Sequence, residues 1–123
     1  VQIAEMINNA VEISLGCIHD PQFGPFIMIS AGGVLVELLN DRKVALCPIS
    51  DEEAFCLVNE LKVSRLLNGY RGKPAVNINA LVKTIVQFSQ FATEFQEYFS
   101  EIDINPLLIN TEGCYAVDAL IAR

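Results

Sequence analysis

The sequence has few charged residues and no long apolar run, and both absences narrow the class of protein. Charged residues make up 19% of the 123 residues and hydrophobic residues 52%, which is too apolar for a disordered chain and leaves room for one core. No apolar run reaches the roughly 20 residues that a membrane helix needs, and the first residues lack the basic start of a signal peptide. We therefore expect a single domain at 1–123 and no membrane partner.

Basic residues and histidine are scarce as well. Eight Lys and Arg stand against 15 Asp and Glu, and the net charge of −7 argues against a nucleic acid partner, which calls for clustered cations. The four cysteines include no C-x-x-C pair, and the chain has one histidine, so the spacing is not that of a zinc site. Three cysteines have apolar neighbours, namely Cys17, Cys47 and Cys56. We expect buried, reduced thiols in a cytoplasmic protein.

The first half of the chain alternates short apolar segments with turn residues. The densest turn formers lie at 20–25, and further ones at 32–33 and 40–41. The apolar segments between them, expected to be strands, lie at 1–6, 12–19, 26–31, 34–39 and 43–47. Several short strands joined by such turns predict an antiparallel or mixed sheet.

The middle of the chain changes to helical spacing. Ser50 followed by Glu53 is a capping box and predicts a helix that begins after Ser50. After a connector at 68–74, apolar residues step by four and three along a second expected helix, at Leu81, Ile85, Phe88, Ala92, Phe95 and Phe99. We interpret that stripe as core packing.

The last residues return to strand patterning. Segments 101–110 and 114–121 flank a turn at 110–113, which predicts a hairpin. The expected fold is therefore α/β, with a mixed or antiparallel sheet, two main helices and a C-terminal β-hairpin.

Polar residues gather on one face of this hairpin. Glu101, Asp103 and Asn105 alternate with isoleucines, so all three point to the same face of their strand. If 111–112 are the central turn residues, the numbers of opposed residues add to 223. Asn105 then lies opposite Asp118, with Cβ atoms roughly 5 Å apart. Two oxygen ligands at that spacing can bind one Mg²⁺, with phosphate and water completing its shell.

The same pattern has an alternative, a hairpin whose polar face is simply solvated. Apolar residues flank Asp118 at 116–117 and 119–121, and a carboxylate buried among them would need a partner that a metal could supply. Pro106 argues the other way, because it lacks a ladder donor and a bulge there would shift the register by one residue. Both interpretations stay open at this point.

Four separately spaced stretches resemble the ATP-grasp region of ADP-forming acyl-CoA synthetases, which is similar to the β subunit of succinate–CoA ligase. They follow the family's order along nearly the whole chain, at 12–16 with 20–25, 32–34 with Glu37, 70–74, and 101–108 with 116–119. The resemblance implies that the chain is the C-terminal part of an ATP-grasp nucleotide-binding module. The lysine and the flexible loop that cover the phosphates are then expected N-terminal of Val1.

The resemblance also implies site residues. Asn105 and Asp118 are expected to bind the Mg²⁺ of Mg-ATP, with Asp103 as an additional or indirect ligand. The segment Glu5-Met6-Ile7 is similar to the stretch whose backbone meets the adenine. Glu12 matches an acidic position that contacts the nucleotide, expected at the ribose. Taken without the family, the two glutamates are interpreted as exposed strand carboxylates.

The implied activity is that of a ligase. In this family the nucleotide phosphorylates a histidine, which relays the phosphoryl group between ATP or ADP and an acyl phosphate, and the acyl group passes to coenzyme A. The protein mainly positions the reacting groups, and the metal neutralises their charge. The relay histidine and the coenzyme A site are expected on other domains or subunits. His19, beside a turn, is interpreted as a surface residue.

Three positions depart from the family pattern. Ser30 replaces a usual glycine, 8–10 replaces a turn richer in glycine and proline, and Ala45 replaces an arginine that would hold phosphate charge. The missing arginine favours an alternative function, a non-catalytic region of a protein lysine acetyltransferase that senses acyl-CoA or a nucleotide. The retained pair of Asn105 and Asp118 favours the ligase.

Overall fold

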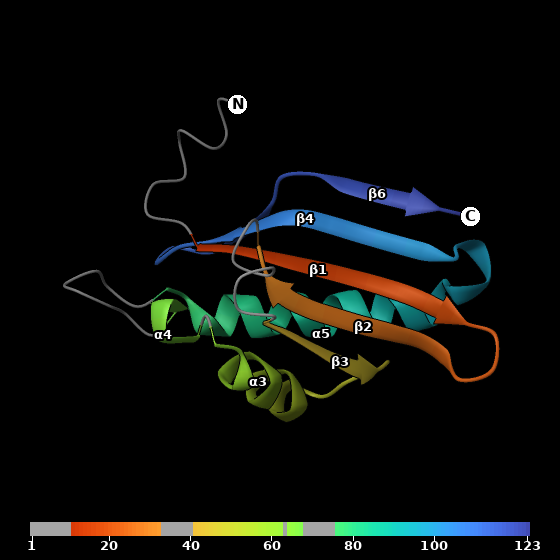
Figure 1. Cartoon of the computed structure of the whole chain (residues 1–123), viewed down its shortest axis with the longest axis horizontal. Coiled ribbons are helices and arrows are strands. Elements are labelled where there is room, and N and C mark those ends of the chain that lie inside the picture. Colours follow the sequence, from red (N-terminus) through yellow and green to blue (C-terminus); the bar gives the residue numbers. More distant parts are fainter. Residues whose placement is uncertain (1–10, 33–40, 63, 68–75) are drawn as a thin grey trace.

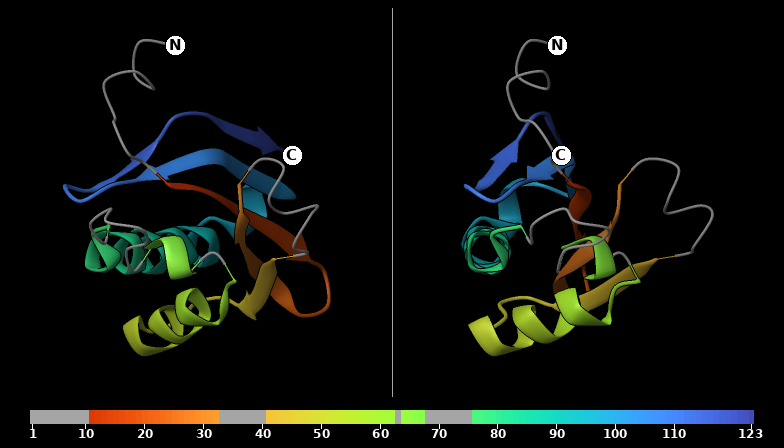
Figure 2. Two further views of the ribbon diagram at one scale, coloured as in Figure 1. Left: turned by 60° about the vertical axis from the view of Figure 1, so that its left-hand side comes forward. Right: turned by 90° about the vertical axis from the view of Figure 1, so that its left-hand side faces the viewer.

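The computed structural model describes residues 11–32, 41–62, 64–67 and 76–123 (Figure 1). Within these ranges the chain forms one six-stranded antiparallel sheet, with the order β3-β2-β1-β4-β5 and with β6 paired to β4 beside β5. The helices of the described residues lie on one side of this sheet (Figure 2). The expected α/β class is confirmed, and the described strands pair antiparallel, one of the two arrangements expected.

Three strands make up one half of the sheet. They are β1 (Val11–Asp20), β2 (Gly24–Ala31) and β3 (Arg42–Leu46), which confirms the strands expected at 12–19, 26–31 and 43–47. The turn between β1 and β2 is held by the Asp20 carboxylate, whose Oδ1 accepts hydrogen bonds from the backbone N–H groups of Gln22 and Phe23 at 2.7 and 2.9 Å. Gly24 ends this turn with a φ of 88°, a backbone conformation that glycine adopts at no steric cost.

The first helix, α3 (Asp51–Glu60), begins as the sequence predicts. The Ser50 hydroxyl accepts a hydrogen bond from the Glu53 N–H at 3.1 Å, and the Ser50 N–H donates to the Glu53 carboxylate at 3.2 Å. Two of the N–H groups that a helix start leaves unpaired are therefore satisfied. A short helix, α4 (Ser64–Leu67), follows.

The longest helix, α5 (Ile78–Glu94), is followed by a 3₁₀ turn, η1 (Gln96–Tyr98). Four residues of the expected stripe are buried on it, at Leu81, Ile85, Phe88 and Ala92. The continuation of the stripe through Phe95 and Phe99 is wrong. Phe95 is the C-cap and is 38% exposed. Phe99 is buried, but it lies beyond the helix and has an extended backbone. A spacing of four and three does not mark the last turn of a helix, because residues beyond the end can be buried as well.

The C-terminal hairpin has the register that the sequence predicts. Asn110 donates its N–H to the Gly113 carbonyl at 3.0 Å, and its side-chain oxygen accepts from two backbone N–H groups of the turn. The numbers of paired residues add to 223 near the turn, as in Ile109 with Cys114, and also farther along β4, as in Ile104 with Ala119.

The segment after the turn is two strands rather than the expected one at 114–121. β4 (Glu101–Ile109) pairs with β5 (Cys114–Ala116) and then with β6 (Ala119–Ala122), and residues 117–118 belong to neither. β5 and β6 form the outer edge of the sheet beyond β4, and β6 is seen there in Figure 1.

The core lies between the sheet and the helices (Figure 2). Alternate residues of β1 and β2 are fully buried there, namely Ile13, Leu15, Cys17, Ile27, Ile29 and Ala31. Ser89 of α5 is fully buried too, and its hydroxyl donates to the Val86 carbonyl at 2.7 Å and accepts from the Ile49 N–H at 3.2 Å. The main helix is thereby attached to the segment that leads into α3.

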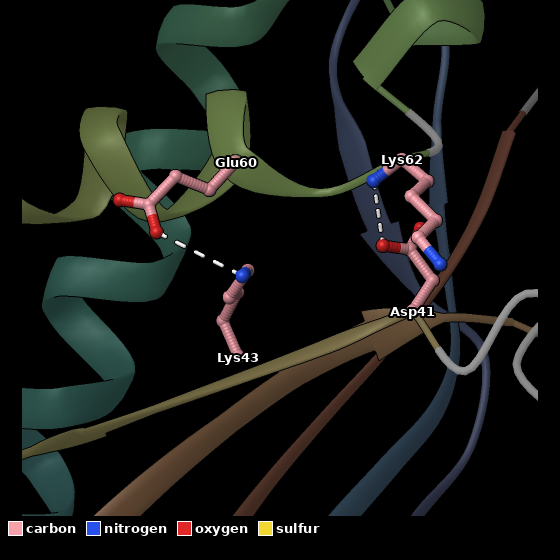
Figure 3. A network of polar contacts seen from close by, with 4 residues as sticks. All are labelled: Asp41, Lys43, Glu60 and Lys62. Carbon is pink, nitrogen blue, oxygen red and sulfur yellow. Dashed lines mark hydrogen bonds and ion pairs between the residues drawn. The ribbon is translucent and has the colours of Figure 1, made fainter.

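Polar contacts also connect α3 and the residues after it to β3 and the residue before it (Figure 3). The buried carboxylate of Asp41 accepts a hydrogen bond from the Lys62 N–H at 2.5 Å, just after α3. Lys43 reaches Glu60 of α3, with Nζ and Oε1 3.8 Å apart. Lys43 therefore points toward the helix layer.

Some expectations lie outside the described residues. They are the strands at 1–6 and 34–39 and the connector at 68–74. Within the described ranges, no helix is long and apolar enough to cross a membrane.

Candidate functional site

The face of the sheet opposite the helices, called the open face below, carries polar and small side chains. On β1, Ser14 and Gly16 alternate with the buried Ile13 and Leu15, so they point to this open face. Gly16 is paired with Asp103 of β4, which places the Asp103 side chain on the same face.

One row of side chains crosses the open face from β3 to the C-terminal hairpin. Arg42 is paired with Ser30, and Ser30 with Ser14. The register of β1 and β4 shifts by one residue here, because Ile13 pairs with Leu107 and Leu15 with Ile104. Ser14 therefore lies opposite residues 105–106 of β4. Asn105 in turn donates its N–H to the Asp118 carbonyl at 3.1 Å. These residues, called the polar row below, are Arg42, Ser30, Ser14, Asn105 and Asp118.

A cleft of about 290 Å³ lies over most of the polar row. Small residues line its middle, namely Ser14, Gly16 and Ser30, while Arg42 lies at the β3 end and Asn105 at the β4 end. A Cβ atom added at Gly16 would lie 3.7 Å from Oδ1 of Asp103, so the carboxylate of Asp103 reaches over this glycine.

Asn105 and Asp118 are directly opposed in the register of 223, so their side chains share a face. Both residues are exposed, and Oδ1 of Asp118 accepts a hydrogen bond from the Ala119 N–H at 2.9 Å. Among the described residues no three His, Cys, Asp or Glu side chains converge. A hard cation held by this pair would therefore take further ligands from phosphate or water.

The expected burial of Asp118 is wrong. Residue 118 lies in the break between β5 and β6 at the edge of the sheet, and Ala119, Leu120 and Ile121 beyond it are exposed themselves. An apolar neighbourhood in sequence does not bury a side chain on an edge strand. Burial of the Asp118 carboxylate therefore gives no argument for a metal, whereas the position of Asp118 opposite Asn105 still does.

The bulge expected from Pro106 exists, but on the other side of β4. It shifts the register of β4 against β1, between the pairs of Ile13 and Leu15. The pairing with β5 and β6 keeps the sum of 223 on both sides of Pro106. Asn105 and Asp118 are therefore not displaced from each other.

The other expected site residues are only partly described. Glu12 is exposed and lies two residues before Ser14, so it points to the open face about 7 Å farther along β1. Its carbonyl accepts a hydrogen bond from the Gly32 N–H at 3.0 Å. Glu5, Met6 and Ile7 lie outside the described residues.

The interpretation of Ala45 as the lost phosphate-holding position is wrong. Ala45 is paired with the buried Ile27 and packs against the core, so a side chain at this position points to the helix-covered face. Arg42, three residues earlier, points to the open face and lines the cleft.

The cysteines and the histidine do not contribute to the polar row. All four thiols are free, and a hydrogen bond with Cys47 lowers the pKa of the buried Cys17, although burial opposes this. The same hydrogen bond and burial raise the pKa of Cys47. Cys56 is exposed on α3, so its expected burial is wrong. His19 is half-buried, with its ring 6.4 Å from that of Phe99, so it is not a fully exposed surface residue.

Comparison with known protein families decides the assignment. The model of the ATP-grasp domain matches residues 1–122, almost the whole chain. The chain belongs to the ATP-grasp family. The resemblance noted in the sequence is thereby confirmed.

The ATP-grasp chain is similar to β subunits of ADP-forming acetate–CoA ligases. It is 41% identical to that of ligase I of Pyrococcus furiosus over 119 residues, which cover 97% of this chain and 51% of the relative. It is 37% identical to the ADP-forming 4-hydroxybutyrate–CoA ligase of Nitrosopumilus maritimus, covering 98% of this chain and 18% of the relative. The chain thus spans about half the length of the β subunits that it matches.

Solved structures agree with these relatives. One is a dinucleotide-forming acetyl-coenzyme A synthetase 1 of Ca. Korarchaeum cryptofilum, bound to coenzyme A and Mg-AMPPCP, with a phosphohistidine segment pointing towards its nucleotide binding site. The TM-score is 0.85 at 37% identity, covering 91% of this chain and 52% of that one. A protein of Pyrococcus horikoshii gives a TM-score of 0.82 at 33% identity, covering 91% and 48%.

Sequence reasoning missed most of the cleft. Ser14 and Gly16 could have been found, because they alternate with the apolar residues of a predicted strand. Arg42 and Ser30 could not be placed together, since their pairing depends on a register set across the segment between β2 and β3.

Proposed function

We propose that this chain is the part of an ADP-forming acyl-CoA synthetase that holds the catalytic metal and the phosphates of the nucleotide. The observation that carries the proposal is the opposed pair of Asn105 and Asp118, beside a cleft on the open face of an ATP-grasp domain. The intact protein would couple the conversion of ATP to ADP and phosphate with the joining of a carboxylic acid to coenzyme A. Residues 1–123 would be one domain, the C-terminal part of the nucleotide-binding module.

The residues at the hairpin fit a magnesium ion. Asn105 offers an amide oxygen and Asp118 a carboxylate, the hard oxygen donors that Mg²⁺ prefers. Both side chains are exposed, so the ion could keep water and bind phosphate oxygens. When bound, Mg²⁺ would neutralise the negative charge that phosphoryl transfer concentrates on the phosphates.

The remaining residues of the cleft would position the nucleotide. The hydroxyls of Ser14 and Ser30 offer hydrogen-bond donors, and Gly16 leaves room above β1 for a close approach. We propose Glu12 for the ribose and 5–7 for the adenine. Because β1 runs from residue 11 toward residue 20, the phosphates in this proposal would follow the ribose along the strand, over Ser14 and Gly16.

The histidine that receives the phosphoryl group and the coenzyme A site would lie on other domains or subunits of a cytoplasmic enzyme. The Pyrococcus relatives are themselves described as subunits, and the phosphohistidine segment of the Korarchaeum synthetase points towards the nucleotide binding site of that enzyme. The relatives named above give no support to the acetyltransferase alternative. Arg42 lines the cleft on the open face, so a cation is available to the site although residue 45 is alanine.

The test is made on the intact protein that contains this chain. ADP formation is measured with acid, coenzyme A and Mg²⁺, and again with each omitted or with a metal chelator. We expect ADP only when all are present, loss of activity in Asn105→Ala, and normal activity in Asn79→Ala, which makes the same change on an exposed residue of α5. Activity that resists the chelator, or an unaffected Asn105→Ala, would contradict the proposal.

A further inference from the structure

The cleft has a cation at the end away from the metal pair. Arg42 is exposed on β3 and lines the cleft together with Ser30 and Asn105. Within the described ranges its guanidinium has no ion pair or hydrogen bond. Its neighbour Lys43 points to the other face and reaches Glu60. Of two adjacent cations, one is engaged with the helix layer and the other faces the site.

The separation of Arg42 from the metal pair suits an extended ligand. Arg42 and Asn105 lie on strands three places apart in the sheet, so their backbones are about 14 Å apart at the usual strand spacing. The long arginine side chain can reach back over β2 and shorten this gap. What remains in the middle is lined by small residues, Ser14, Gly16 and Ser30. A single phosphate cannot contact both ends of such a strip, whereas a chain of phosphates can.

The charges of the cleft point the same way. Asp103 lies at the β4 end and Asp118 just beyond it, so a phosphate can approach there only through a bound cation. At the β3 end the guanidinium can bind a phosphate directly, with two parallel N–H donors to two oxygens. The cleft therefore offers a metal-assisted anion site at one end and a direct anion site at the other.

We propose that Arg42 binds the polyphosphate tail of the nucleotide at the end of the cleft opposite Asn105 and Asp118. This inference rests on the proposed function, since the metal-assisted end is part of it. Arg42 contacts a phosphate beyond the first one, because the first follows the ribose near Glu12 at the start of β1. Arg42 thereby distinguishes nucleotides with a polyphosphate tail from nucleoside monophosphates.

The test compares neutralised variants of the intact protein. Binding of Mg-ATP, Mg-ADP and AMP is measured by calorimetry for the parent, Arg42→Gln, Arg42→Lys and the matched control Lys43→Gln. A charge-assisted hydrogen bond corresponds to about 10- to 100-fold in affinity, and we expect Arg42→Gln to lose that much for ATP. AMP affinity should stay unchanged, Arg42→Lys should fall between parent and Arg42→Gln, and Lys43→Gln should bind like the parent.

The outcomes separate this inference from the function on which it rests. If the parent binds Mg-ATP but Arg42→Gln binds it equally well, or loses AMP and ATP affinity alike, Arg42 does not hold the tail and only this inference fails. If the parent binds no nucleotide, both fail. Because Arg42 is exposed, its variants should melt with the parent, so a loss of ATP affinity would come from the site and not from the fold.

Discussion

Replacing Asp118 by asparagine separates a role at the metal from a role in the fold. The carboxylate is exposed, and its hydrogen bond within the described residues comes from the N–H of Ala119, the next residue. The side-chain oxygen of asparagine can accept the same bond. We therefore expect the free energy of unfolding without nucleotide to change by no more than about 0.5 kcal/mol.

The effect on chemistry should be far larger. The pair of Asn105 and Asp118 offers one carboxylate, and the substitution would leave two neutral amides for an ion that prefers anionic oxygen. Charge stabilisation by a catalytic metal amounts to several kcal/mol. Losing about 3 kcal/mol of it would lower kcat/KM roughly 150-fold.

Thermal melts and a coenzyme A consumption assay on the same preparations decide the matter. Glu112→Gln is the matched control, since it makes the same change on an exposed carboxylate in the turn of the same hairpin. The control should melt and turn over like the parent. Near-normal turnover in Asp118→Asn, or a melting temperature well below that of the parent, would mean that Asp118 supports the hairpin and not the metal.

Three further substitutions test the structure around the site. Ser89→Ala would leave the buried N–H of Ile49 without its acceptor, so chemical denaturation should show a loss of about 1–3 kcal/mol. Gly32→Ala would place a Cβ atom 2.7 Å from that of Glu12 and 3.0 Å from its carbonyl carbon, so the same measurement should show about 1–3 kcal/mol of destabilisation. Ala45→Arg should leave calorimetric affinity for Mg-ATP unchanged, because position 45 faces the helices; a gain in affinity would contradict the assignment of faces.

The features that the sequence predicted correctly depend on contacts between near neighbours. The capping box joins Ser50 to Glu53, and the hairpin turn joins Asn110 to Gly113. Once that turn is fixed, strand geometry sets the later pairs, so the opposition of Asn105 and Asp118 follows by counting. The geometry of the proposed metal pair could therefore be derived from the sequence alone.

The features that the sequence could not predict depend on distant parts of the chain. Which of Arg42 and Ala45 faces the cleft is set by the pairing of β3 with β2, and the residues of β3 alone do not fix that register. The exposure of Asp118 depends on β5 and β6 lying at the edge of the sheet. Neither property is encoded in the residues next to the position concerned.

Side chains alternate between the two faces of β3, so the variants Arg42→Gln and Lys43→Gln each remove one cation, from opposite faces of the sheet. Changing either residue to glutamine takes the net charge from −7 to −8, so any effect of the overall field on an anionic nucleotide is the same in both variants. The Lys43–Glu60 contact joins two partly exposed side chains, and its loss should cost no more than about 1 kcal/mol of stability. A lower ATP affinity in Arg42→Gln than in Lys43→Gln would therefore measure the contribution of a cation on the open face, relative to one on the helix-covered face.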